Sequence, residues 1–278
     1  MTNSVESYQH EYDIAVATAR EAGALLRSQV GNLHDVRFKS AVDPVTEADR
    51  ASEELIATRL LDAFPNDRLL AEEGSAALDN AGAERMWIVD PLDGTTNFMH
   101  GYPHFCVSIA LHVGDATQVG VIYDPMRGEL FAALHGHGAT LNGAEIAVSD
   151  TTELLSSMLC SGFAYDLTWR AENLPYWARF VELSQAVRRD GAAALDIVYV
   201  ACGRFDGYWE RGVAAWDVAA AALILREAGG IVTTYDGRTF HPFAREIVAS
   251  NPQLHANMLA VIADVARTQP LVGPNDFT

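Results

Sequence analysis

Two aspartates, Asp90 and Asp93, follow an apolar segment with the bulky, β-branched character of a buried strand. Pro91 is expected to end that strand, so that both carboxylates project from the strand end into a turn, where a rigid sheet can hold them close together. Gly94 then allows the backbone to approach a ligand closely, and the amide groups after it can begin a short helix whose N-terminus attracts an anion. Two hard oxygen ligands beside an anion-binding turn are suited to phosphate chemistry assisted by Mg²⁺.

Three further carboxylates could belong to the same site. Glu72 and Glu73 follow an apolar run, at the end of a strand that could lie beside the strand before Asp90. Taken alone, such a pair is most often part of a solvated loop. Asp217 lies in the first turn of a predicted helix so apolar that it must be buried. A carboxylate there either interacts with the helix dipole, which is the commoner case, or points into a site as a ligand.

The elements that must position these residues alternate between helical and strand-like patterns. Residues 6–29 are expected to form an amphipathic helix, and a second helix starts near Thr46, a good N-cap residue. Asp49 lies in the first turn of that helix, and Pro65 ends it. Short turns then separate three strands, which predicts an antiparallel meander. These strands span residues 106–113, 117–123 and 130–134, and residues 136–143 follow as a loop.

The second half of the chain alternates in the same way. A nearly all-apolar helix over residues 216–228 carries Asp217 and ends at a pair of glycines. A strand over residues 205–210 ends at Glu210, one short loop before that helix. The other elements predicted here are strands near 158–162, 231–234 and 246–250, and helices over 175–187, 194–203 and 253–266.

The motifs together resemble those of the inositol monophosphatase family. The family signature is an apolar strand followed by Asp-Pro-(Ile/Leu)-Asp-Gly-Thr, which matches residues 90–95. Val-Thr-x-x-Asp at 45–49, the glutamate pair at 72–73 and Trp-Asp-x-Ala at 216–219 match further family motifs in the same order. Each motif alone is weak, whereas four in order over most of the chain are specific.

The resemblance implies a fold of mixed α and β structure, the layered α-β-α-β-α sandwich of the sugar phosphatases. It implies an N-terminal α+β subdomain over residues 1–145, which carries the antiparallel sheet and the main metal motif. A C-terminal α/β subdomain over residues 146–278 would supply Asp217 and the substrate side. The resemblance also implies a homodimer.

By the same resemblance, the site would hold two or three Mg²⁺ ions. Glu72, Asp90 and the Leu92 carbonyl would hold one ion, and Asp90, Asp93 and Asp217 would hold a second. Asp90 would then bridge the two ions, and a third ion would bind loosely near Glu72. A pair of ions can stabilise both the attacking and the leaving oxygen of an in-line displacement.

A water molecule activated by metal needs a base that orients and deprotonates it. The resemblance assigns this role to Thr95, whose hydroxyl would relay the proton to Asp49, and it places Glu72 among the catalytic residues. Read alone, Asp49 is a carboxylate that satisfies backbone amides at a helix start. Lys39 matches a family lysine near the metal site, although read alone it is a solvated surface lysine.

The resemblance implies six residues in substrate binding: Gly94, Thr95, Thr96, Gly191, Ala192 and Glu210. The amides of Gly94 and Thr95 would hold the phosphate, and Thr96 favours the inositol-type subgroup because other branches often carry lysine there. Ala192 stands where the family has serine or threonine, so only backbone contact remains at that position. Glu210 would accept hydrogen bonds from substrate hydroxyls, whereas a glutamate at a strand end is more often on the surface.

Composition limits the classes of partner. About half of the 278 residues (49%) are hydrophobic, enough for a sizeable core in one large or two closely packed domains. The formal charge of −18 disfavours nucleic acid and anionic membranes, although bound divalent ions would still admit a small anionic substrate. The few cysteines, the polar residues 1–12 and the lack of a long apolar run predict a cytoplasmic protein without a membrane span.

The family resemblance thus implies an enzyme, a lithium-sensitive phosphomonoesterase dependent on Mg²⁺. Its substrate would be a small phosphorylated polyol, inositol 1-phosphate or a related sugar phosphate, attacked in line by a water molecule. Histidinol phosphate, fructose 1,6-bisphosphate and 3′-phosphoadenosine phosphate are alternative substrates within the family, and a non-catalytic regulatory homologue is a further alternative. An aspartyl-phosphate enzyme of the haloacid-dehalogenase type is disfavoured, because this chain has one residue too many between its two aspartates. The histidines at 100, 104, 135 and 137 form no zinc pattern, so loop or packing roles are expected for them.

Overall fold

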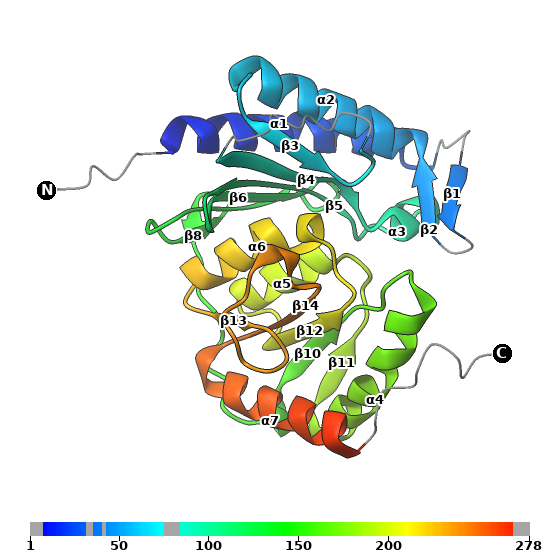
Figure 1. Ribbon diagram of the computed structural model, residues 1–278, viewed down its shortest axis with the longest axis vertical. Coiled ribbons are helices and arrows are strands. Elements are labelled where there is room, and N and C mark those ends of the chain that lie inside the picture. Colours follow the sequence, from blue (N-terminus) through cyan, green and yellow to red (C-terminus); the bar gives the residue numbers. More distant parts are fainter. Residues whose placement is uncertain (1–7, 32–35, 41–42, 75–83, 269–278) are drawn as a thin grey trace, which may run out of the picture.

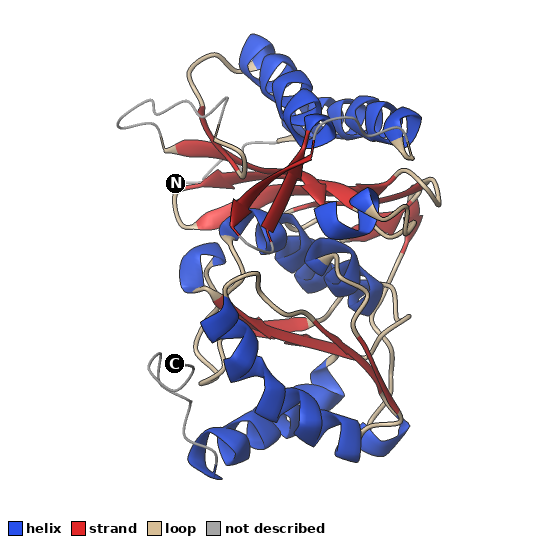
Figure 2. Ribbon diagram, turned by 90° about the vertical axis from the view of Figure 1, so that its right-hand side faces the viewer, coloured by secondary structure: helices blue, strands red, loops and turns tan. Residues whose placement is uncertain are grey.

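The structure, a computed structural model, describes residues 8–31, 36–40, 43–74 and 84–268 of the chain. Five layers follow one another through the molecule: a pair of helices, a sheet, a second pair of helices, a second sheet and a third pair of helices (Figures 1 and 2). This order is the α-β-α-β-α sandwich that the family resemblance implies, and the predicted fold class is confirmed.

Within the described residues, the first sheet has the strand order β3-β4-β5-β6-β7-β8-β9. Strands β3 and β4 are parallel, and the later neighbours are antiparallel, as the predicted meander requires. Residues 136–143, predicted as a loop, contain the short strand β8. The glycines on either side of it indicate a loop in the sequence, but pairing with β7 stabilises the strand. The strands span Arg68–Ala71 (β3), Arg85–Asp93 (β4), Cys106–Val113 (β5), Ala116–Asp124 (β6), Glu129–Leu134 (β7), Ala139–Leu141 (β8) and Ala144–Glu145 (β9).

Strand β4 does not end at Pro91, contrary to the prediction, but continues to Asp93. Its pairing with β5 shifts register between Asp90 and Asp93. A proline has no amide hydrogen to donate, and an irregularity of this kind is one of the few places where a paired strand tolerates that loss. Both aspartates are therefore held by the end of a rigid sheet, as expected, but each is paired with β5 and neither lies in the following turn.

Helices α1 and α2 cover the outer face of the first sheet and span Gln9–Gln29 and Glu47–Ala63 (Figure 1). Helix α2 begins after Thr46, as predicted, because the Thr46 hydroxyl accepts hydrogen bonds from the amides of Ala48 and Asp49. In return, the Asp49 carboxylate accepts from the Thr46 amide at 2.7 Å. This reciprocal cap holds Asp49 at the start of the helix.

The second sheet has the order β11-β10-β12-β14-β13 in the described part of the chain. Helices α5 and α6 lie between the two sheets, and α4 and α7 cover the outer face of the second sheet (Figures 1 and 2). The alanine-rich α6 approaches the first sheet so closely that a Cβ at Gly120 would lie 2.7 Å from the carbonyl oxygen of Ala220. These elements span Met158–Ser161 (β10), Leu167–Leu183 (α4), Ala186–Arg188 (β11), Ala193–Ala201 (α5), Gly207–Arg211 (β12), Ala215–Glu227 (α6), Ile231–Thr233 (β13), Glu246–Ser250 (β14) and Pro252–Thr268 (α7).

Helix α4 differs from the helix predicted over residues 175–187. It begins after Asp166, whose carboxylate accepts hydrogen bonds from the amides of Thr168 and Trp169, and it contains Pro175 in its interior. An interior proline costs about 3 kcal/mol. The N-terminal cap and the burial of the inner helix face against the sheet offset this cost. Residues 186 and 187, predicted to be helical, belong instead to strand β11, which pairs with β10.

Smaller elements complete the fold. A hairpin precedes α2, and a single helical turn follows β4 at the edge where the acidic motif lies. These elements are the strands Val36–Ser40 (β1) and Asp43–Thr46 (β2), the helix Thr95–Met99 (α3), and the 3₁₀ turns Leu154–Ser156 and Pro242–Ala244.

Candidate active site

A cavity of about 310 Å³ opens where the end of β4 faces the ends of β10 and β12 and the first turns of α5 and α6. Residues from both halves of the chain line it, so the fold brings together segments far apart in the sequence. Ten residues predicted for the site are among them: Glu72, Asp90, Leu92, Asp93, Gly94, Thr95, Gly191, Ala192, Glu210 and Asp217.

Asp90 and Asp93 lie at the centre of the acidic group and are only 2% and 8% exposed. Asp90 Oδ1 accepts a hydrogen bond from the Leu92 amide at 3.0 Å. Burial raises the pKa of Asp90 well above its usual value, and the neighbouring charges of Glu72, Asp93 and Asp217 raise it further. Burial, together with the charge of Asp217, does the same to the pKa of Asp93. The site therefore concentrates negative charge that a cation would offset.

Glu72 follows β3, which runs parallel to β4, so it lies at the same end of the sheet as Asp90. Its amide donates to the Val89 carbonyl at 3.2 Å and so extends the strand pairing by one residue. The next amide, that of Glu73, donates to Glu53 Oε2 at 2.9 Å. The predicted placement beside β4 is thus correct, and Glu53 is a supporting residue that the sequence analysis did not identify.

Asp217 occupies the first turn of α6, where its Oδ2 accepts from the Ala214 amide at 2.7 Å. It also lines the cavity. Helix capping and ligand binding, which were alternatives for this residue on sequence alone, are compatible in this geometry, because one carboxylate has two oxygens.

Thr95 connects the cavity to Asp49. Its hydroxyl donates to Asp49 Oδ1 at 2.9 Å and lies 3.1 Å from the Leu92 carbonyl oxygen. Asp49 is fully buried and does not itself line the cavity, and burial raises its pKa. Asp49 therefore serves as a helix cap through Oδ2 and contacts the site through Oδ1 by way of Thr95.

The turn between β4 and α3 requires glycine at position 94. Gly94 has φ +94°, and a Cβ there would lie 3.0 Å from the His104 carbonyl oxygen. Thr96 is not among the residues that line the cavity, but its hydroxyl lies 3.0 Å from the Tyr165 hydroxyl, and Tyr165 does line it. Lys39 belongs to strand β1, and its side chain lies outside the described part of the structure.

On the opposite wall, Glu210 is only 6% exposed, so the alternative of a surface glutamate is wrong. The Tyr208 hydroxyl donates a hydrogen bond to Glu210 Oε2. Burial raises the pKa of Glu210 to about 8. Gly191 has φ +90°, and Ala192, at the start of α5, is 1% exposed.

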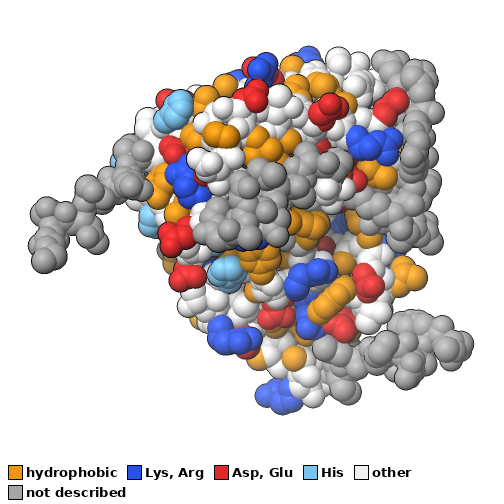
Figure 3. Space-filling model, turned by 45° about the horizontal axis from the view of Figure 1, so that its top comes forward, with side chains coloured by type: hydrophobic (Ala, Val, Ile, Leu, Met, Phe, Trp, Pro, Cys, Tyr) orange, Lys and Arg blue, Asp and Glu red, His pale blue; other side chains and the backbone are white. Residues whose placement is uncertain are grey.

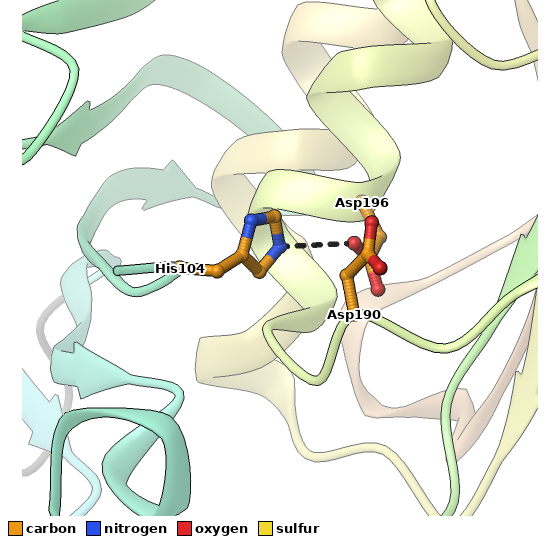
Figure 4. A group of neighbouring side chains, drawn as sticks. All are labelled: His104, Asp190 and Asp196. Carbon is orange, nitrogen blue, oxygen red and sulfur yellow. Dashed lines mark hydrogen bonds and ion pairs between the residues drawn. The ribbon is translucent and has the colours of Figure 1, made fainter. Parts of the chain in front are cut away.

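A second group of ionisable residues joins the two walls (Figure 4). His104 Nε2 lies 3.2 Å from Asp196 Oδ1, and one ligand atom each of His104, Asp190 and Asp196 lie within 4.8 Å of one another, close enough for a metal ion. Asn97 Nδ2 donates to the carbonyl oxygens of His104 and Asp190, both at 2.8 Å. Asp93 Oδ2 accepts from the Ala194 amide at 2.7 Å, so the metal motif is tied to α5 as well.

His104, for which a loop or packing role is expected from the sequence, contacts Asp196, which belongs to no motif of the sequence. A signal for Asp196 was present, because it is the one acidic residue in the apolar helix α5. Asn97 follows the signature motif in the sequence, but the motif does not predict its two hydrogen-bond partners, the carbonyl groups of His104 and Asp190.

Among the described residues, no helix is both long and apolar enough to cross a membrane.

Comparison with known proteins gives consistent matches over nearly the full length. The Inositol monophosphatase family matches residues 7–267. An inositol-1-monophosphatase of Synechocystis sp. is 45% identical over 253 residues, which cover 90% of this chain and 88% of that protein. The Nus factor SuhB of Escherichia coli is 39% identical over 255 residues, or 91% of this chain and 95% of that protein.

A solved structure supports the same relationship. The inositol monophosphatase from Anabaena (Nostoc) sp. superposes with a TM-score of 0.84 and 45% identity, covering 92% of this chain and 96% of that chain. Since the family match spans almost the whole sequence, it includes both walls of the cavity. The chain belongs to the inositol monophosphatase family and is a phosphomonoesterase.

Proposed function

We propose that this protein hydrolyses a small phosphate monoester in a reaction that depends on Mg²⁺. The observation that carries the proposal is the convergence of Glu72, Asp90, Asp93 and Asp217 on one cavity. Hard carboxylate oxygens are the ligands that Mg²⁺ prefers. The mutual repulsion of these carboxylates, which contributes to the raised pKa of Asp90, is what a bound divalent ion would relieve.

Glu72, Asp90 and the Leu92 carbonyl would hold one ion, and Asp90, Asp93 and Asp217 a second, with a third possible near Glu72. When bound, the ions would supply Lewis-acid chemistry that activates water and stabilises negative charge. The hydroxyl of Thr95 would orient the attacking water and pass its proton to Asp49, with which it already shares a hydrogen bond of 2.9 Å. The amides of Gly94 and Thr95 would hold the phosphate.

For the alcohol part of the substrate, we propose a polyol such as that of inositol 1-phosphate. The buried Glu210 offers a hydrogen-bond acceptor for hydroxyl groups across the cavity from the proposed metal ligands, and the Synechocystis relative is named an inositol-1-monophosphatase.

We further propose a cytoplasmic homodimer whose subunits each contain two subdomains, residues 1–145 and 146–278. On the face in Figure 3, acidic and basic side chains of described residues are interspersed, which suits a small-molecule partner better than a nucleic acid.

A regulatory role is a second candidate, because relatives of 39–41% identity carry the name Nus factor SuhB. The four cavity carboxylates favour catalysis, since a purely regulatory homologue has no need to keep them. The two functions can also coexist in one chain.

The test is an assay of the purified protein against a panel of phosphate monoesters, with Mg²⁺ and with a chelator. The panel contains inositol 1-phosphate, histidinol phosphate, fructose 1,6-bisphosphate, 3′-phosphoadenosine phosphate and glycerol 2-phosphate. We expect hydrolysis that requires Mg²⁺ and is fastest with inositol 1-phosphate. Full activity in the chelator would contradict the metal-dependent mechanism, and no activity on any ester would favour the regulatory role.

A further inference from the structure

Two residues of strand β12, Tyr208 and Glu210, lie on the same face of the second sheet because they alternate along the strand. That face packs on the helices between the two sheets. Tyr208 is fully buried and belongs to their apolar core, whereas Glu210 reaches the cavity. The Tyr208 hydroxyl donates a hydrogen bond to Glu210 Oε2. A ring held by the core thus contacts one oxygen of a carboxylate that faces the substrate.

The neighbouring strand closes another side of this carboxylate. β10 runs parallel to β12, with Ser161 paired to Trp209, so that Gly162 lies beside Glu210. A Cβ at Gly162 would overlap the carboxylate group of Glu210. Because Gly162 also lines the cavity, glycine at this position leaves the room in which the carboxylate lies.

The two oxygens of Glu210 therefore have different surroundings. Among the described residues, Oε2 accepts the hydrogen bond from Tyr208, and Oε1 accepts none. Glu210 lines the cavity despite its deep burial. One oxygen is thus held by the protein, and the other is available to a ligand.

We propose that Tyr208 is a positioning residue. It holds the Glu210 carboxylate so that Oε1 accepts a hydrogen bond from a hydroxyl group of the substrate alcohol. This inference rests on the proposed function and narrows its substrate class to esters of a cyclic polyol, whose ring fixes a hydroxyl group opposite Oε1, in contrast to the flexible hydroxyls of glycerol 2-phosphate. Without the Tyr208 hydroxyl, the carboxylate can turn about its terminal torsion, and a substrate hydroxyl must then select one orientation among several.

The experiment compares kcat/KM of the Tyr208→Phe variant for inositol 1-phosphate and for glycerol 2-phosphate, in saturating Mg²⁺. Phenylalanine keeps the buried ring and removes only the hydroxyl. We expect a loss of about tenfold for the inositol ester, the scale of one hydrogen bond, and less than about threefold for the glycerol ester. The loss should lie mainly in KM, because the hydroxyl contact is made in the ground state as well as in the transition state. Equal losses on the two esters would overturn the proposal, and so would no loss on either.

A double-mutant cycle with Glu210→Gln tests whether Tyr208 acts through Glu210. In that background Tyr208→Phe should change kcat/KM for the inositol ester by less than about twofold, because the acceptor is already altered. If the losses of the two single variants multiply in the double variant, Tyr208 does not act through Glu210, and the proposal is overturned.

Two further variants guard against a purely structural effect. Tyr199→Phe makes the same change at another buried tyrosine, whose hydroxyl has no hydrogen-bond partner among the described residues and which does not line the cavity. It should leave both esters unaffected. Gly162→Ala should reproduce the ester-selective loss by displacing the carboxylate, and it tests the proposal even if Tyr208→Phe fails to fold. Failure of the unaltered protein to hydrolyse either ester would refute the proposed function, a result distinct from any of those above.

Discussion

Asp90 and Glu210 are both carboxylates at the ends of buried strands, and burial raises the pKa of each. Their neighbours differ. Asp90 faces other carboxylates, whereas Glu210 accepts a hydrogen bond from a tyrosine hydroxyl. A cluster of like charges is suited to a divalent cation, and a single carboxylate with one oxygen held is suited to a hydroxyl group. The comparison teaches that the groups around a buried acid, and not burial itself, decide what it can bind.

Removal of charge at the metal end should have the largest effect. Asp90→Asn should lower kcat/KM by several orders of magnitude, because a proposed bridging ligand is lost. Without divalent ions the variant should be as stable as the unaltered protein or slightly more stable, since one of several like charges is removed. Assays in Mg²⁺ and thermal unfolding in a chelator check the two parts.

The stereochemistry at phosphorus tests the role of Asp90 independently of the variant. Direct attack by water inverts the configuration of a chirally labelled ester. Net retention of configuration, or a trapped aspartyl-phosphate, would show that Asp90 is a nucleophile. Asp90 and Glu210 would then no longer differ as metal ligand and hydroxyl acceptor.

The proton relay should contribute less than the metal ligands. Asp49→Asn keeps the shape of the side chain and weakens its ability to accept a proton from Thr95, so kcat should fall by about 10²–10⁴-fold, the usual contribution of general base catalysis. A steady-state assay at several pH values measures this loss. If Thr95→Ala lowers activity while Asp49→Asn does not, then Asp49 acts only as the cap of α2.

A smaller and more selective effect is expected at the substrate end. Above pH 8, where Glu210 is ionised, Glu210→Gln should lower kcat/KM for inositol 1-phosphate by about tenfold to a hundredfold, the value of a hydrogen bond to a charged acceptor. The loss of kcat/KM for glycerol 2-phosphate, which has fewer hydroxyls, should be much smaller. Equal losses of kcat/KM for the two esters would mean that Glu210 supports the metal site or the fold. Glu210 would then have no separate role in substrate binding, in contrast to the comparison with Asp90.

The last effect concerns the pH dependence of stability and not activity. The folded-state pKa of Glu210 lies at about 8, above its ordinary value of 4.5, so the folded protein binds a proton there that the unfolded chain has released. The free energy of unfolding should therefore fall as pH rises from 4.5 through about 8, by at most about 1.4 kcal/mol per pH unit from this group. Glu210→Gln lacks this contribution.

Urea unfolding of both proteins without divalent ions measures the difference. The variant should gain relative stability with rising pH over this window. A difference that stays constant with pH would mean that Glu210 ionises normally.

The sequence alone determined the fold class and most of the acidic motif that lines the cavity. Short motifs carry this information locally: β4 and the aspartates at its end, Gly94 with its positive φ, and Thr46 with Asp49 as a helix cap. Patterns of this kind depend on neighbours a few residues away, so they can be read from the printed chain. The course of β4 through Pro91 and the true start of α4 could not be read in this way, because pairing and packing with distant segments outweigh the local preference of proline.

Only the tertiary structure decided which isolated residues meet. Glu210 could be a surface residue on sequence alone, and it is buried because β12 lies between β10 and β14 under the central helices. The contacts of Asn97 with Asp190 and of Tyr208 with Glu210 could not be predicted, since the packing of the folded chain brings these residues together and no known motif links them. Local chemistry therefore shows which residues have the donor atoms for a metal, whereas the packing of two distant sheets decides which residues line the cavity.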